Sequence, residues 1–263
     1  MNNIIIDGDF PTVVLWFAAY CFLGWVWESA YRSIKSGKLV NSGFLTGPYV
    51  PIYGFGALLY IFLMHFTLNP IILFFLGGLT ACILEYATSW LLEKIFRARW
   101  WDYSDSFMNI NGRICLIGFC AFAAFAVILP YIQLGVGQLI NLMTSGWRIA
   151  TVIIFATTIL YDAYKTSRGL VKFNKTLARY QEEIEKHAAP LVDIIRKGKR
   201  TFEMHFAKGR EKTREILTYQ QRRIMAAFPS FESIQYPDAF KKIRKLYEDS
   251  RYKPQRVKTK KKK

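Results

Sequence analysis

Four charged side chains stand in surroundings where charge is rare. Glu28 and Glu85 lie within apolar stretches, Asp102 follows a pair of tryptophans, and Arg113 begins a further apolar stretch. Carboxylates in a poorly solvated place can act as general acids and bases, and an arginine beside them can hold a phosphate group. The same residues can instead bind a solute that crosses a membrane, or form internal ion pairs. The residue types therefore permit acid–base chemistry, transport or a structural role.

Arg113 is the charge that most needs a partner. It lies in the first turn of a predicted helix, where the positive end of the helix dipole disfavours a cation. An anion should compensate it: Glu28, Glu85, Glu93, Asp102 or a bound ligand. We expect Glu85 and Arg113 to depend on each other, because Glu85 lies about 12 Å inside an apolar stretch, where a carboxylate is costly.

Residues 41–56 are rich in glycine and proline. Four Gly and two Pro among these residues exclude a regular helix, yet Phe44, Leu45 and Tyr49 are too apolar for a fully solvated loop. Irregular backbone at membrane depth is tolerated only when it is buried in protein or lines a wet cavity. We therefore predict a re-entrant or tightly packed loop whose backbone groups can hold a ligand, with 41–54 as a mobile gate. A rigid turn is the alternative.

Helical spacing predicts several local contacts. Residues three or four apart share one face of a helix, so Glu28 should pair with Arg32, and Asp162 and Lys165 should form a local pair. Small and acidic residues recur at steps of four from 77 to 93, which lets another helix approach closely.

The candidate substrate or gating site combines these features with the polar residues after position 100. Its residues are Glu28, Asn41, Gly43, Gly47, Pro48, Tyr53, Glu85, Trp101, Asp102, Asn111 and Arg113.

Five apolar stretches must position this site. They cover 11–31, 50–68, 70–93, 114–133 and 147–164, each near the ~20 residues that cross a bilayer. Lys and Arg between them fall on one side, with Arg148 as the exception. Basic loops stay in the cytoplasm, so we predict an all-α polytopic membrane helix bundle of about five transmembrane helices with its N-terminus outside and its C-terminus cytoplasmic. The candidate site then faces the cytoplasm.

The chain divides into two parts by charge. Residues 1–164 hold 8 basic and 8 acidic side chains, so the net charge of +17 lies in 165–263. This basic cytoplasmic tail is predicted to be helical, with an apolar stripe over 170–184, a break at Pro190, and disorder over 253–263. Expected partners are the lipid bilayer and its anionic inner-leaflet lipids, or a second copy through 170–184. Nucleic acid is the least favoured, because no recognition motif accompanies the lysines.

Motifs of common enzyme centres are missing from the sequence. It has no nucleotide-binding Gly-x-x-x-x-Gly-Lys-Ser/Thr loop, no His-Glu-x-x-His zinc motif and no Gly-x-Ser-x-Gly elbow. We therefore predict no cofactor, no metal site and no catalytic residue. The four cysteines lie in or beside the apolar stretches without metal spacing, which is typical of buried apolar side chains.

Several strings over about residues 15–165 resemble a family of bacterial integral membrane proteins, the putative ABC-transporter type IV or CmpB-type permeases. The strings are Gly24-Trp25-Val26-Trp27-Glu28-Ser29, Asn41-Ser42-Gly43-Phe44-Leu45-Thr46-Gly47-Pro48, Pro51-Ile52-Tyr53-Gly54, Leu84-Glu85-Tyr86, Trp100-Trp101-Asp102-Tyr103-Ser104 and Asn111-Gly112-Arg113-Ile114-Cys115. The sequence departs from the family pattern at Ser42, where arginine is expected. The resemblance implies a permease in the bacterial plasma membrane.

These observations favour a permease-like transport component that lacks its own nucleotide-binding domain. Its energy would come from a separate ATPase subunit or an ion gradient, and Glu85 and Arg113 would balance the charge of the site. One alternative is a membrane-embedded enzyme that acts on inner-leaflet lipid headgroups, with Glu28, Glu85 and Asp102 as acid or base and Arg113 on a phosphate. Another is a membrane scaffold that recruits partners through its basic tail.

Overall fold

The protein is all-α in its computed structural model, which describes residues 8–195 and 217–251. The predicted fold class is confirmed. Strands are limited, in these described ranges, to one short antiparallel pair. The elements, in chain order, are α2 (Phe10–Ser36), α3 (Pro51–Met64), α4 (Pro70–Phe96), β1 (Ala98–Arg99), α5 (Leu116–Asn141), α6 (Ser145–Ile195), α8 (Tyr219–Ala227), β2 (Glu232–Ser233) and α9 (Pro237–Arg251).

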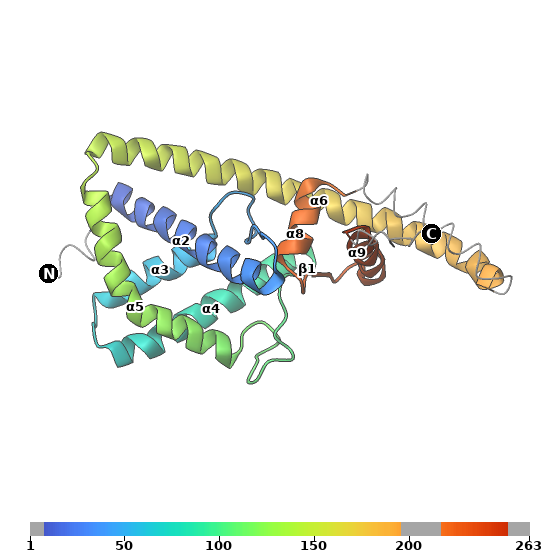
Figure 1. Ribbon diagram of the computed structural model, residues 1–263, viewed down its shortest axis with the longest axis horizontal. Coiled ribbons are helices and arrows are strands. Elements are labelled where there is room, and N and C mark those ends of the chain that lie inside the picture. The colour runs from blue at the N-terminus through green and yellow to red at the C-terminus, as the bar shows by residue number, and fades with distance from the viewer. Residues whose placement is uncertain (1–7, 196–216, 252–263) are drawn as a thin grey trace, which may run out of the picture.

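Helices α2 to α5 form a bundle, and α6 runs along one side of it and continues beyond it (Figure 1). Three of these helices, α2, α4 and α5, are long and apolar enough to cross a membrane. Each has 26 or 27 residues, which gives a length of about 40 Å against a hydrocarbon layer of about 30 Å. Large apolar side chains such as Phe75, Ile117 and Leu139 point outward from the bundle. Outward apolar faces of this kind suit contact with lipid.

Helix α3 is shorter than the predicted stretch 50–68. It has 14 residues, or about 21 Å, because irregular backbone extends as far as Val50 and the chain turns after Met64. Asn69 then begins α4, where its side-chain oxygen accepts the amide of Ile71 (2.9 Å). The irregular loop 37–50, which is largely buried only after position 41, and α3 thus occupy together the place where one regular span was predicted.

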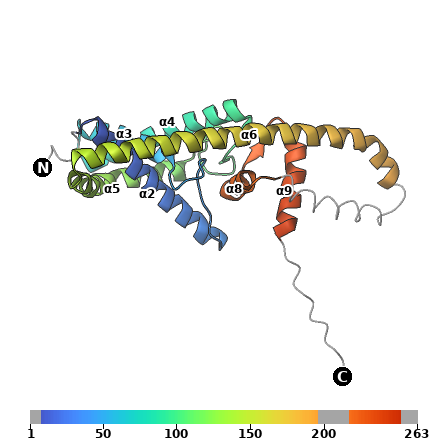
Figure 2. The ribbon, with the colours of Figure 1, turned by 90° about the horizontal axis from the view of Figure 1, so that it is seen from above.

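Helix α6 is a single 51-residue helix, about 77 Å long. The stretch 147–164 and the tail stripe were predicted as separate helices, but α6 joins them without a break (Figure 2). The break predicted at Pro190 is wrong, since α6 continues through it to Ile195. A proline removes one helix hydrogen bond, and a long helix can absorb that loss. Helix α5 likewise contains Pro130 and extends to Asn141, past the predicted end at 133.

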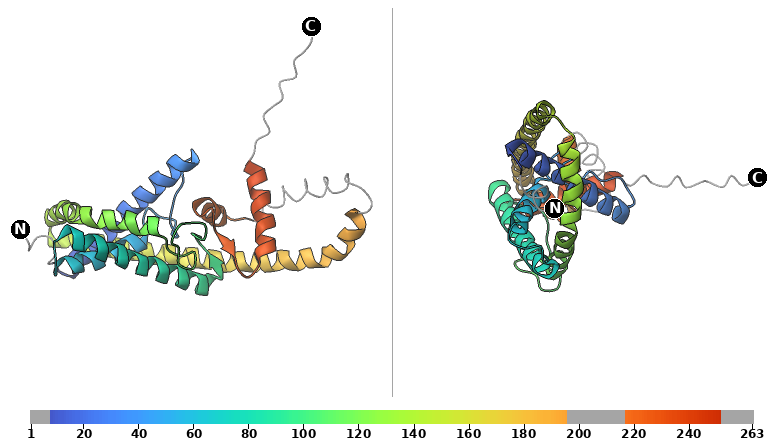
Figure 3. Two further views of the ribbon diagram at one scale, coloured as in Figure 1. Left: turned by 90° about the horizontal axis from the view of Figure 1, so that it is seen from below. Right: turned by 90° about the vertical axis from the view of Figure 1, so that its left-hand side faces the viewer.

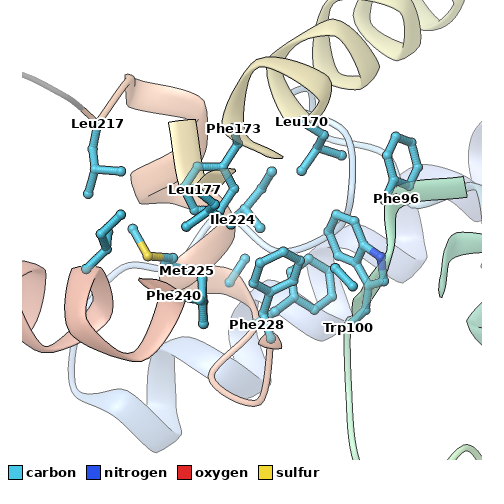
Figure 4. Packing of buried hydrophobic residues seen from close by; sticks show 14 of the residues in the cluster. Phe96, Trp100, Leu170, Phe173, Leu177, Leu217, Ile224, Met225, Phe228 and Phe240 are labelled. Atoms are coloured by element: carbon cyan, nitrogen blue, oxygen red, sulfur yellow. The ribbon is translucent and has the colours of Figure 1, made fainter. Parts of the chain in front are cut away.

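The tail folds back onto the bundle and has a core of its own (Figures 3 and 4). Phe173 and Leu177 of the predicted apolar stripe are almost fully buried against α8 and α9. The aromatic rings of Trp100 and Phe228 meet edge to face at 5.1 Å, which joins the end of α4 to the tail. The core cluster also includes Phe96, Ala98, Leu170, Leu217, Ile224, Met225, Ala227, Phe231, Ala239, Phe240 and Ile243.

Backbone pairing strengthens this junction. β1 and β2 pair antiparallel, with Ala98 opposite Ser233, and the Ile234 amide donates to the Arg97 carbonyl (2.9 Å). The Asn174 side chain of α6 donates to the Phe96 carbonyl at the end of α4 (2.9 Å). The chain itself therefore covers Leu170, Phe173 and Leu177 of the apolar stripe, and these side chains reach a second copy only if α8 and α9 move away. The predicted disorder of 253–263 lies outside the described residues.

Arg148, the basic residue on the unexpected side, is well supplied with partners. Its guanidinium donates to the Met143 carbonyl (3.1 Å) and to the Thr12 hydroxyl (3.3 Å). Asp9 begins α2 as its N-cap, and its charge also acts on Arg148. A local anion and two oxygen acceptors explain how one cation is held at this end of the bundle.

Candidate functional site

Most of the candidate residues meet at one end of the bundle, where α2 and α4 end and α5 begins (Figure 1). We call this the polar end. The residues do not form a single group but three, which lie around Glu85, around Arg113, and along loop 41–50.

The Glu85 cluster consists of Glu28, Arg32, Tyr53, Glu85 and Tyr103. Glu85 is only 7% exposed, and its Oε1 accepts a hydrogen bond from the Tyr103 hydroxyl (2.9 Å). Its Oε2 is buried without any hydrogen-bond partner. The charges of Glu28 and Glu85 both act on the Tyr53 hydroxyl, which places the two carboxylates and the phenol in one neighbourhood. The cluster thus has an acceptor atom that no residue in 8–195 or 217–251 satisfies.

Tyr103 acts in this cluster as a donor. Burial, followed by the neighbouring Glu85 carboxylate, raises the pKa of the Tyr103 hydroxyl. The hydroxyl therefore keeps its proton and donates it to Glu85. Tyr103 is not among the residues predicted from the sequence, because its place beside Glu85 depends on how the segment after α4 folds back.

Small residues on α4 and α5 allow Glu85 to sit so deep. Gly77 meets Ala126 of α5, and Gly78 lies against the Phe119 ring, so the two helices pack closely. A methyl group built at Gly118 of α5 would lie 3.7 Å from Glu85 Oε2, which is an ordinary contact distance. The unpartnered oxygen therefore faces the α4–α5 interface at a position without a side chain. The predicted small-residue face of α4 is confirmed.

Helices α2 and α3 supply the other half of the cluster. Glu28 and Arg32 form the predicted pair, with Nε and Oε1 2.9 Å apart. The Tyr53 ring packs directly over Gly24, where any side chain would collide with it. Glycine at position 24 is therefore what lets α3 carry the Tyr53 hydroxyl toward both carboxylates.

Arg113 has a different partner from the one we expected. Its Nη2 lies 2.7 Å from Glu93 Oε2, and its Nη1 donates to the Ser89 hydroxyl (3.1 Å). The guanidinium also lies over the Tyr86 ring, 5.5 Å from its centre. The predicted dependence of Arg113 on Glu85 is wrong at the level of direct contact. Glu93 is two helical turns further along α4, level with the start of α5, and so reaches Arg113 more easily.

The remaining predicted residues after position 100 shape the turn around Arg113. Trp101 donates its ring N–H to the Arg113 carbonyl (3.0 Å), and the Asn111 side chain donates to the Tyr86 hydroxyl (2.9 Å). Asp102 is exposed, and hydrogen bonds from Ser104 lower the pKa of its carboxyl. Asp102 is thus held as an anion by local donors and is a poor general acid.

Loop 41–50 is fixed rather than free. The Asn41 side chain accepts from the Trp25 ring N–H (2.7 Å) and donates to the Thr46 carbonyl (2.8 Å). The amides of Thr46 and Gly47 both donate to Asp162 Oδ2 of α6, each at 2.8 Å. The prediction of a tightly packed loop is confirmed, but these bonds leave little freedom for the predicted mobile gate. Pro48 is exposed, and none of its described contacts assigns it a role.

Asp162 holds the loop from the side of α6. Its carboxylate also accepts from the Tyr49 hydroxyl (3.0 Å) and the Thr166 hydroxyl (3.2 Å). The expected local pair with Lys165 is not formed, because Asp162 faces inward whereas Lys165 is exposed. Nothing in the sequence around Asp162 signals this role.

Arg223 of α8 holds the same loop from the opposite side. Its Nη1 donates to the Gly43 carbonyl (2.9 Å), and its Nη2 donates to the Phe44 carbonyl (2.6 Å). Gly43 adopts a left-handed backbone (φ +94°), which turns its carbonyl toward the guanidinium and favours glycine there. Arg223 was not predicted, since it is one of 28 basic residues in 165–263 and nothing in the sequence distinguishes it.

The polar end can therefore bind a charged ligand through its ionisable side chains. Within the described ranges, no three His, Cys, Asp or Glu side chains gather closely enough to hold a metal ion. Glu93 binds Arg113, and loop 41–50 engages Asp162 and the two Nη atoms of Arg223. Among the described residues, Glu85 Oε2 and Arg223 Nε are buried without a hydrogen-bond partner, and of these two only Glu85 Oε2 can accept a hydrogen bond or bind a cation.

Comparison with known proteins identifies the family to which the chain belongs. Comparison with curated proteins and with solved structures gave no match. The model of the family described as putative ABC-transporter type IV matches residues 15–167, which cover α2 to α5, the first part of α6 and every candidate site residue. This match spans more than half of the 263 residues. The chain is a membrane protein of a transport-related family and belongs to the putative ABC-transporter type IV family.

Proposed function

We propose that the protein is a permease-like transport component whose binding site is the Glu85 cluster. The observation that carries the proposal is Glu85 itself, a buried carboxylate on an apolar helix with one oxygen unsatisfied. An ionisable group within a membrane span is costly and is retained where it meets a substrate or ion. Arg113 and Asp102, the other predicted charges, have full sets of partners and serve to shape the polar end.

The orientation of the site follows from the distribution of basic residues. The first and third connections between the apolar stretches carry Lys and Arg, and the tail carries the whole net charge. We propose that the polar end and the tail face the cytoplasm of a bacterial cell and that the bundle lies in its plasma membrane. Exposed cations on the outer face of α6, such as Lys172 and Lys175, would then meet anionic lipid.

Energy for transport would come from a partner or a gradient. The sequence has no Gly-x-x-x-x-Gly-Lys-Ser/Thr loop for nucleotide phosphates. The family description supports a separate ATPase subunit as the partner. The alternative of an enzyme acting on lipid headgroups loses its expected phosphate ligand, because the Arg113 guanidinium is engaged by Glu93 and Ser89.

A complementation experiment tests the transport function. Cells that lack the protein would receive the wild-type chain or Glu85→Gln, and the solutes and lipids of cells and medium would be profiled. Transport predicts that the wild-type chain shifts an unmodified solute between cells and medium and that Glu85→Gln does not. Glu232→Gln is a matched control, because Glu232 is an exposed glutamate of the tail whose ion pair with Lys241 is at the surface.

Two results would refute the proposal. A change in lipid species without any redistribution of a solute would indicate the enzyme. Full restoration by Glu85→Gln would show that the Glu85 carboxylate is not part of the site. Each variant should be checked for its amount in the membrane, so that loss of function is not confused with loss of protein.

A further inference from the structure

The charge around Glu85 does not balance. Glu28 is neutralised by Arg32, which lies 2.9 Å away. Arg113, the other cation of the candidate site, is bound to Glu93. Within the described residues, Glu85 has no ion-pair partner, and its Oε2 accepts no hydrogen bond. When Glu85 is ionised, the cluster therefore carries one uncompensated negative charge in a buried place.

The groups that face Glu85 come from every element around it. They are Glu28 and Arg32 of α2, Tyr53 of α3, Cys82 of α4, and Tyr103 and Cys115 of the connection to α5. Arg32 is the only cation in this set, and it is paired. The others are carboxylate, phenol and thiol groups, which present oxygen or sulfur to the site. An anion would meet two carboxylates here, so the surroundings exclude anionic ligands.

Desolvation makes a bare carboxylate costly at this position. An ionised group removed from water loses many kcal/mol of hydration unless a counter-charge replaces it. A single positive charge suffices, because Arg32 already balances Glu28. Carboxylate and phenol oxygens are ligands for hard cations and acceptors for protons. Gly118 leaves room for a methyl-sized group beside Oε2, since a methyl carbon there would lie 3.7 Å from this oxygen.

We infer that Glu85 Oε2, between Tyr53, Tyr103 and Glu28, is the binding site of one exchangeable monovalent cation, a proton or an alkali-metal ion. This inference rests on the proposed function, since it specifies the ligand class of the same site. A transport component with such a site can couple its conformation to the occupancy of that cation, because a ligand stabilises the state that binds it.

Thermal unfolding of the full chain in detergent tests the cation site. Melting temperature would be measured against NaCl and KCl, with choline chloride keeping the ionic strength constant, and separately against pH. If the cation is an alkali ion, the melting temperature rises with the logarithm of its concentration. If it is a proton, the melting temperature falls as the pH rises and does not respond to the salts.

The variants separate the site from the rest of the protein. Glu85→Gln should lose the dependence on either cation, while Glu232→Gln should keep it in full. Glu28→Gln should retain a weakened dependence, because Arg32 would then partly supply the missing charge. A wild-type protein that responds to neither monovalent ion nor pH, or that responds only to MgCl₂ or CaCl₂, overturns the inference.

The outcome is independent of the transport assay. A flat melting temperature together with failed complementation by Glu85→Gln would reject the cation site and leave the transport function standing. A clear cation response together with full complementation by Glu85→Gln would support the cation site and reject the transport function proposed for Glu85.

If Glu85→Gln does not fold, Gly118→Val is the second variant, because its larger side chain would fill the space beside Oε2 without removing the carboxylate. Unchanged salt dependence in folded Gly118→Val would overturn an alkali-ion site.

Discussion

The ion pair between Arg113 and Glu93 gives a sharp test of the polar end. Arg113 is 8% exposed and has two acceptors, Glu93 at 2.7 Å and Ser89 at 3.1 Å. Replacing Glu93 by Gln keeps the shape of the side chain and removes its charge. The guanidinium is then left in a buried place with a neutral partner, so the free energy of unfolding should fall.

The size of the effect follows from burial. Removing one partner of a fully buried pair costs roughly 3–5 kcal/mol. The Glu93 side chain is 28% exposed, so water can replace part of the lost interaction. We therefore expect a loss of about 2 kcal/mol for Glu93→Gln and a larger loss for Arg113→Gln, which strands Glu93 and also empties the space over Tyr86.

A double-mutant cycle separates the pair from general damage. The assay is unfolding of the purified full chain in detergent by a denaturant that preserves its micelles. Glu93→Gln and Arg113→Gln should couple by about 1–2 kcal/mol. Glu85→Gln and Arg113→Gln form the control cycle, and their effects should add, because the two residues have no direct contact. Coupling in the control cycle with additivity in the first would refute the assignment of partners.

The remaining predictions concern the loop, the tail and the orientation. Asp162→Asn should destabilise the protein by about 1–3 kcal/mol and expose loop 41–50 to protease, because one amide oxygen cannot replace a carboxylate that accepts two amides and two hydroxyls. Asp105→Asn, the same change at an exposed aspartate outside the loop, is the control, and equal cleavage of the loop would count against the argument. Leu177→Glu places a charge in the fully buried tail core, so it should release α8 and α9 for proteolysis; an intact tail would contradict the packing. In a Cys120→Ser background, an impermeant thiol reagent should label Leu142→Cys in intact cells and spare Leu39→Cys, and the opposite pattern would reverse the proposed orientation.

Local spacing predicted the contacts that one helix makes with itself or with its nearest neighbour. The Glu28–Arg32 pair follows from a step of four residues, and the close approach of α5 to α4 follows from glycines on one face. The depth of Glu85 followed from its position in an apolar stretch. These features depend on residues of one apolar stretch and their spacing, so they can be predicted without knowing how distant parts of the chain meet.

Contacts between distant parts of the chain could not be predicted in this way. Asp162 lies 116 residues after Thr46, and Arg223 lies 180 residues after Gly43. Nothing in their local sequence indicates that they approach loop 41–50. Glu93 was one of the four anions left open as partners of Arg113, but Glu85 was favoured, because Glu85 and Glu93 share one face of α4 and only the height of α5 beside it decides between them.

Loop 41–50 shows how the tail becomes part of the membrane bundle. Asp162 and Arg223 are both buried and carry opposite charges, yet each binds the peptide groups of the loop: Asp162 takes amides at 46 and 47, and Arg223 takes carbonyls at 43 and 44. The loop thus bridges two charges, and it cannot move without leaving one of them buried and unsatisfied. Ser42 stands where the family resemblance predicts an arginine, and Arg223 lies beyond the matched residues 15–167. The Arg223 guanidinium reaches this loop from the tail, and its two hydrogen bonds to the loop help to hold α8 against the polar end.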